Sequence, residues 1–145
     1  MRWLIPALMA VLLSACSDDQ SVTAPADTEE TRSEETVASP ATTEAFSGTL
    51  EVGSAASYAF AVLESGTVKV TLVEVGGTLV PPTIMLGMGI GTPSGRGCSS
   101  NPTMVQAGSE PQVTGTFAPG RYCVGLSDVG NLLAPATFLV TIAHP

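Results

Sequence analysis

Hydrophobic and polar residues alternate with a period of two along much of residues 46–145. Strict alternation over short runs is typical of half-buried antiparallel strands. Turn-forming Gly, Pro, Asn and Ser residues separate the runs, and no stretch has a sustained helical period with caps. The alternation predicts seven strands, at residues 46–52, 58–62, 68–75, 84–90, 113–117, 122–126 and 138–142. We therefore expect an all-β domain, a seven-strand antiparallel β-sandwich that is jelly-roll or immunoglobulin-like.

The alternation has two irregularities. Leu72 and Val73 are adjacent apolar residues, which indicates either a β-bulge or a strand buried on both faces. In the fourth run, a stripe of glycines shares the face opposite the core set: Gly87, Gly89 and Gly91. Glycine in a strand lets another backbone or a ligand approach closely. We expect the nearby Gly- and Pro-containing segment, residues 92–108, to cover this stripe.

The N-terminus has a different pattern, a short apolar run at residues 3–13 behind Arg2. It is too short to cross a hydrocarbon core, which needs about 20 helical residues, so it indicates a signal sequence. The run leads into Leu13-Ser14-Ala15-Cys16, which resembles a bacterial lipoprotein signal. The resemblance implies cleavage before Cys16, acylation of its sulfur and new amine, and attachment to the membrane of the cell envelope. In a Gram-negative host, Ser17 after the lipidated cysteine favours the outer membrane. The alternative is an ordinary signal peptide with Cys16 near the cut by chance.

Residues 17–45 have the composition of a tether. They contain eight acidic side chains and one basic one, with few large apolar residues among Ser, Thr, Ala and Pro. Such a segment cannot bury enough apolar surface to offset the entropy of ordering, so we expect residues 16–45 to be a lipidated, disordered acidic linker. We interpret it as a spacer; capture of a cationic or calcium-bearing partner is the alternative.

The remaining residues, 46–145, form one domain with five acidic and three basic side chains. Its length is sufficient for a self-supporting hydrophobic core. No clustered basic face is present, so we expect no binding to nucleic acid.

Two cysteines, Cys98 and Cys123, remain after Cys16 is assigned to lipid attachment. An export signal places them in an oxidising compartment, where a pair of cysteines usually forms a disulfide. Cys123 alternates with core positions and should therefore lie on the outer face of its sheet. A Cys98–Cys123 bond would fix the segment after the fourth strand over that face. Redox and metal sites are the alternatives, but the chain has no Cys-x-x-Cys motif.

The domain carries no recognisable catalytic or metal-binding constellation. Its histidine, His144, is next to last in the chain, and we expect it to be an exposed end. The carboxylates are not paired for acid–base catalysis.

Asp128 and Asn131 could ligate calcium, although a turn cap through backbone amides is the simpler interpretation. The Gly-rich segments 89–91 and 95–97 lack the Lys or helix start that binds phosphate. We predict no catalytic residue and no cofactor.

The strand pattern over residues 46–144 resembles the bacterial pre-peptidase C-terminal domain group. The segments that carry the resemblance are Phe46-Ser47-Gly48-Thr49-Leu50, Tyr58-Ala59-Phe60, Pro119-Gly120-Arg121-Tyr122-Cys123-Val124 and Thr137-Phe138-Leu139-Val140-Thr141. The resemblance implies a jelly-roll-like sandwich without catalytic residues, of a kind often appended to secreted peptidases. Some members bind calcium, polysaccharide or collagen. These 145 residues include no peptidase domain, and Pro81-Pro82-Thr83 stands where many members have acidic residues.

Taken together, the sequence predicts a signal peptide at residues 1–15, a tether at 16–45 and a β-sandwich at 46–145. We expect a lipid-anchored envelope protein whose domain is a non-catalytic binding or structural module. Its partners would be the membrane, through Cys16, and an envelope polysaccharide or protein. The main alternative is an accessory subunit or substrate-targeting module of a secreted hydrolase; a periplasmic chaperone is a third possibility.

Overall fold

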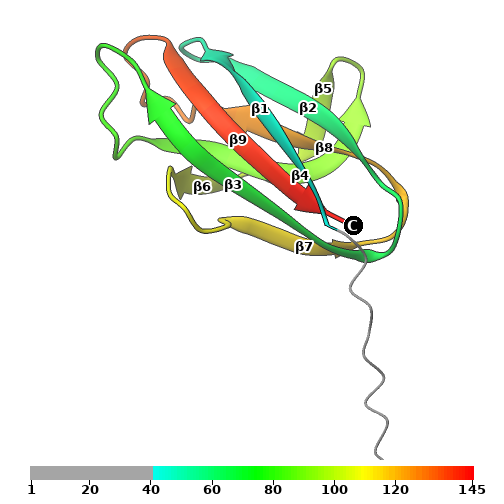
Figure 1. Cartoon of the computed structure of the whole chain (residues 1–145). Coiled ribbons are helices and arrows are strands. Elements are labelled where there is room, and N and C mark those ends of the chain that lie inside the picture. Colours follow the sequence, from blue (N-terminus) through cyan, green and yellow to red (C-terminus); the bar gives the residue numbers. More distant parts are fainter. Residues whose placement is uncertain (1–40) are drawn as a thin grey trace, which may run out of the picture. The chain divides into compact units, whose positions relative to one another are not determined.

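The computed structural model describes residues 41–145, which fold into nine β-strands without a helix (Figure 1). The strands are β1 (Thr42–Leu50), β2 (Ala55–Val62), β3 (Gly66–Gly76), β4 (Met85–Ser94), β5 (Gly97–Ser100), β6 (Thr103–Gln106), β7 (Val113–Phe117), β8 (Gly120–Ser127) and β9 (Ala136–His144). The all-β prediction is confirmed. The predicted number of strands was wrong, because nine strands are present in this part of the chain rather than seven.

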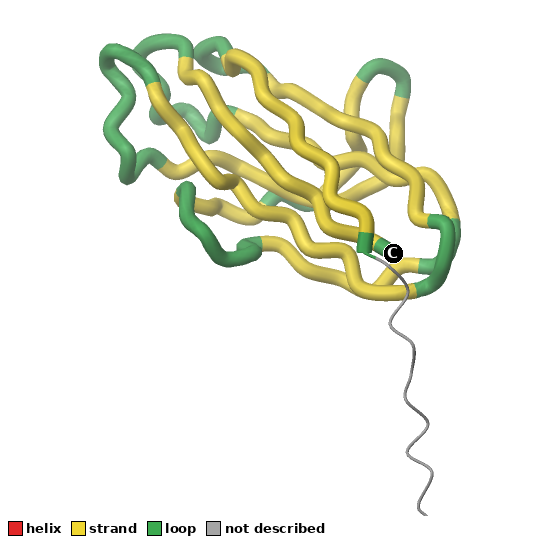
Figure 2. The backbone as a smooth tube through the Cα atoms, in the orientation of Figure 1, coloured by secondary structure: helices red, strands yellow, loops and turns green. Residues whose placement is uncertain are grey.

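The strands form two antiparallel sheets (Figure 2). The first sheet has the order β1-β9-β3-β7, and the second has the order β2-β8-β4-β5, with β6 also paired to β4. Because β1 and β2 belong to different sheets, the chain changes sheet at the turn between them. The start of β1 and the C-terminus lie side by side at one end of the domain (Figure 1).

Side chains from both sheets meet in one hydrophobic core. Val70 and Leu72 of β3 and Met88 of β4 are completely buried. Leu126 of β8 is 1% exposed. Burial of such a side chain contributes about 1.5–3 kcal/mol relative to exposure. The shared core therefore holds the two sheets together, and it is built from the alternating positions of the sequence.

The two strands that the sequence did not predict, β5 and β6, lie in the Gly- and Pro-containing segment, residues 92–108, that was expected to cover the glycine stripe. Both pair with β4: Gly97–Ser100 with its last four residues and Thr103–Gln106 with its first four. Asn101 and Pro102 separate them. Gly, Ser, Asn and Pro remove the period-two signal here, so the strand conformation depends on the hydrogen-bonding edge that β4 provides.

The irregularity in β3 is a bulge. The register between β3 and β9 shifts between Leu72 and Glu74, and Val73 is 39% exposed. The bulge interpretation is confirmed, and burial on both faces was wrong. The extra residue returns Val75, which is 7% exposed, to the core side.

The first strand differs at both ends from the prediction. It begins at Thr42, ahead of the predicted boundary at residue 46, because Thr42–Ala45 pair with the end of β9. These four residues carry no apolar alternation, so only the pairing with β9 identifies them as strand. The strand ends at Leu50, and Val52 is 51% exposed in the turn that follows.

Residues 1–40 lie outside the described part of the chain. They include the predicted leader, the lipidation residue Cys16 and most of the predicted tether. Within residues 41–145, no helix is long and apolar enough to span a membrane.

Candidate binding groove

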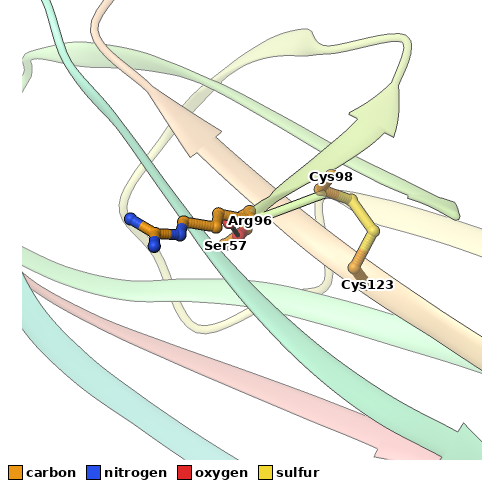
Figure 3. Close-up of a disulfide and its surroundings, with 4 residues drawn as sticks. All are labelled: Ser57, Arg96, Cys98 and Cys123. Carbon is orange, nitrogen blue, oxygen red and sulfur yellow. Dashed lines mark hydrogen bonds between the residues drawn. A yellow bond between two sulfur atoms is a disulfide. The ribbon is translucent and has the colours of Figure 1, made fainter. Parts of the chain in front are cut away.

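A disulfide joins Cys98 of β5 to Cys123 of β8, as the sequence predicted (Figure 3). The two Cα atoms are 5.7 Å apart, a separation usual for bonded cysteines. Cys123 is 2% exposed although it points away from the core set, because β5 covers it. The bond therefore fixes the hairpin of β4 and β5 against the outer face of β8.

The glycine stripe of β4 permits this close packing. A Cβ at Gly89 would lie 2.8 Å from the carbonyl oxygen of Asn101. A Cβ at Gly91 would overlap the carbonyl oxygen of Ser99. Backbone atoms of residues 99–101 thus occupy the space that a side chain would need. The prediction that residues 92–108 cover the stripe is confirmed, and the covering group is the chain itself.

The hairpin between β4 and β5 turns at Gly95 and Arg96. Gly95 has φ +58°, a left-handed conformation that glycine adopts without strain. The turn contacts β2, because the hydroxyl of Ser57 donates a hydrogen bond to the carbonyl oxygen of Arg96 at 3.3 Å. Figure 3 shows the Arg96 guanidinium extending away from the disulfide, beyond Ser57. The backbone of Arg96 is therefore held on both sides while its side chain is exposed.

Beside this hairpin lies an open groove of about 350 Å³. It is lined by residues of β2, the β4–β5 hairpin, β8 and the segment after β5: Ala55, Ala56, Ser57, Arg96, Gly97, Cys98, Ser100, Pro102, Gly125, Leu126 and Ser127. Arg96 is the charged residue of this lining, and serine hydroxyls provide most of its remaining polar side chains. The groove can therefore offer a cation and neutral hydrogen-bonding groups to a ligand.

A second, smaller cavity of about 260 Å³ lies over the first sheet. Ser47, Glu74, Thr137, Phe138 and Leu139 line it. Glu74 is the charged residue of this cavity, and no second ionisable side chain lines it.

Asp128, the candidate calcium ligand, is hydrogen-bonded to four backbone amides. The N–H of Gly53 donates to its Oδ2 at 2.8 Å. The N–H groups of Gly130, Asn131 and Leu132 donate to its Oδ1 at 2.8, 3.1 and 3.2 Å. These bonds, that of Gly53 most of all, hold the pKa of the carboxyl below its ordinary value because they favour the charged form.

Asn131, the second residue of the suggested calcium site, also forms a hydrogen bond through its side chain. The side-chain amide of Asn131 donates to the carbonyl oxygen of Met85 at 2.9 Å. Asp128 thus caps the turn that follows it, as the simpler interpretation held, and Asn131 connects this turn to the start of β4. Within residues 41–145, no group of His, Cys, Asp and Glu side chains is arranged to hold a metal ion.

His144 is buried, so the prediction of an exposed end was wrong. It is 5% exposed, and its Nε2 lies 2.9 Å from Oε1 of Glu44. Its ring centroid lies 5.4 Å from that of Phe60. The prediction failed because it assigned Glu44 to the tether, whereas the early start of β1 places Glu44 beside the end of β9.

Sequence reasoning identified the cysteine pair but missed the groove. The glycines of Gly95-Arg96-Gly97 are typical of phosphate loops, but neither a Lys nor a helix start follows them, so the sequence indicates no role for Arg96. The sequence signal that could have placed Arg96 is its spacing to Cys98. An arginine two residues before a disulfide-bonded cysteine must lie close to that disulfide. The contributions of Ser57 and Ser127 come from distant strands and leave no local pattern.

A comparison of the chain with known protein families and with curated proteins finds no match. The resemblance to the pre-peptidase C-terminal domain group therefore stays a prediction.

Proposed function

We propose that this protein is a lipid-anchored protein of the bacterial cell envelope. In this proposal, Cys16 carries the lipid, residues 17–41 act as a spacer, and the folded domain is a non-catalytic binding or structural module. Figure 3 presents the observation that supports the proposal best, the disulfide between Cys98 and Cys123. Disulfides persist in oxidising compartments outside the cytosol, which agrees with the export signal read from the N-terminus.

We also infer that the two sheets pack face to face as a β-sandwich. The single core that draws side chains from both sheets supports this inference. Within such a module, the groove beside the β4–β5 hairpin is the natural place for a ligand, because concave sites with a few polar groups bind small molecules or segments of polymers.

The anchoring part of the proposal is tested by Cys16→Ala in a bacterial host with lipoprotein processing. We expect the variant to accumulate as unprocessed precursor without attached lipid, and the mature lipidated form to be absent from the membrane fraction. Mass analysis of the mature wild type should show cleavage before residue 16 and an attached lipid. Unchanged processing and fractionation of the variant would exclude lipidation at Cys16.

The binding part is tested by screening the purified full-length protein against an array of envelope glycans and by pull-down from envelope extracts. We expect saturable binding to an envelope polymer or protein. Consistent absence of binding in both screens would leave a spacer role and would contradict the binding module.

A further inference from the structure

Arg96 is a cation without an acidic partner in the described part of the chain. Residues 41–145 contain six acidic side chains, and none of these forms an ion pair with Arg96. The groove beside Arg96 contains no acid. A guanidinium is always charged and presents a planar fork of donors that matches a carboxylate. Its placement at a held hairpin tip therefore favours recognition of a negatively charged group.

The neutral part of the groove is suited to a sugar ring. The hydroxyl of Ser100 has no hydrogen-bond partner within residues 41–145, and that of Ser57 donates to Arg96 while its lone pairs remain available. Ala55 and Pro102 add apolar surface. Sugar hydroxyls can both donate and accept, and the C–H face of a sugar ring packs on apolar groups.

The groove is also formed before any ligand arrives. The disulfide fixes one side of the hairpin, and the Ser57–Arg96 bond fixes its tip. A preformed site loses less conformational entropy on binding than a mobile loop. Its volume of about 350 Å³ is at the small end of ligand sites, which suits one unit or two of a longer polymer.

We propose that this groove binds a carboxylate-bearing saccharide, with Arg96 contacting the carboxylate and Ser57 and Ser100 contacting ring hydroxyls. The proposal rests on the binding role proposed above and specifies its ligand class.

The test is a titration of the full-length protein in detergent with tetragalacturonate, monitored by calorimetry and by amide NMR shifts. The methyl ester of tetragalacturonate is the neutral control ligand, and a tetra-aspartate peptide is the non-saccharide control. The variant is Arg96→Gln, and the control variant is Arg121→Gln, because Arg121 is an exposed arginine that does not line the groove.

We expect tetragalacturonate to bind the wild type and the Arg121→Gln variant equally, and to bind Arg96→Gln about tenfold or more weakly, since a bond to a charged group is lost. Arg96→Lys should give an intermediate affinity, because it keeps the charge without the fork. The hydrogen bond from Ser57 is accepted by the backbone carbonyl of Arg96, which a change of the side chain does not remove. The Arg96 variants should therefore unfold at the same temperature as the wild type. The amide shifts of the wild type should cluster at groove residues, which tests the site without any substitution.

Equal binding of the neutral ester, with no effect of Arg96→Gln, would overturn the acidic class while leaving a saccharide-binding role intact. Equal binding of the aspartate peptide would overturn the saccharide class. Absence of tetragalacturonate binding, or shifts elsewhere on the domain, would overturn this proposal; the glycan and extract screens decide separately whether the protein binds any envelope component.

Discussion

The imidazole of His144 and the carboxylate of Glu44 lie 2.9 Å apart although 100 residues separate them in the chain. Glu44 belongs to the first strand and His144 to the last, and the two strands pair from Thr42 onward. The pair therefore connects the first and last strands at the end of the domain where β1 begins and β9 ends (Figure 1).

Removing one member of this pair should destabilise the domain. Because His144 is buried, Glu44→Ala leaves a polar ring atom without its partner, and we expect a loss of about 1–2 kcal/mol in the free energy of unfolding. Glu44→Gln, which keeps an acceptor oxygen, should cost less. Urea unfolding measures both, with Glu74→Gln on β3 as the control. A double-mutant cycle with His144→Ala should show coupling; strict additivity would contradict a direct interaction.

The same strand predicts the boundary of the stable domain. A chain that begins at residue 46 lacks Thr42–Ala45, which pair with four residues of β9. We expect it to unfold at a lower urea concentration than a chain that begins at residue 41. Equal midpoints would mean that the start of β1 contributes nothing to stability.

Removal of the disulfide should lower stability and release the hairpin. For the 25-residue separation of Cys98 and Cys123, the chain-entropy relation gives about 3.5 kcal/mol. The double variant Cys98→Ala/Cys123→Ala should show this loss in denaturant unfolding, and amide exchange in β5 should accelerate more than in β9. Free-thiol labelling of both cysteines in the unreduced wild type would show instead that the bond does not form.

A methyl group on the glycine stripe should disturb the packing of the hairpin. Gly89→Ala brings a Cβ to 2.8 Å from the backbone oxygen of Asn101, and overpacking of this kind costs about 1–3 kcal/mol. Gly97→Ala is the matched control, since its Cβ would meet its nearest neighbour, the oxygen of Ser94, at 3.7 Å. Comparable stability of the two variants, measured by thermal unfolding, would argue against close packing at Gly89.

Asp128 should make stability depend on acid pH. Its pKa is lower in the folded domain than its ordinary value of 3.8, chiefly through the Gly53 amide, so its contribution is present above that ordinary value and is lost as pH falls through the folded pKa. Asp128→Asn should therefore be less stable than the wild type at pH 7, and the difference should shrink in strong acid. Unfolding measured from pH 7 to pH 2, with Glu110→Gln as control, tests this. A difference that stays constant with pH would contradict the linkage.

The sequence alone determined that the domain is all-β and where most of its strands lie. Alternation is a local property, so the core positions of β3 and β8, such as Val70 and Leu126, could be identified without knowledge of their partners. Local chemistry also indicated a bulge beside Val73, as one of two interpretations, and the cap that Asp128 forms with the nearby amides of Gly130 and Asn131. The bond from the Gly53 amide, 75 residues away in the chain, had no local signal. The Cys98–Cys123 bond followed because only two cysteines remained to be paired.

Tertiary structure decided what depends on partners distant in the chain. Strands β5 and β6 exist because β4 offers them an edge, and Glu44 became part of the domain because β9 lies beside it. His144 is buried for the same reason. The groove required β2, β8 and the hairpin to converge, so Arg96 had no recognisable role until the fold placed Ser57 next to it. Hydrogen bonds between strands carry no sequence code of their own, which is why these features could be found only in three dimensions.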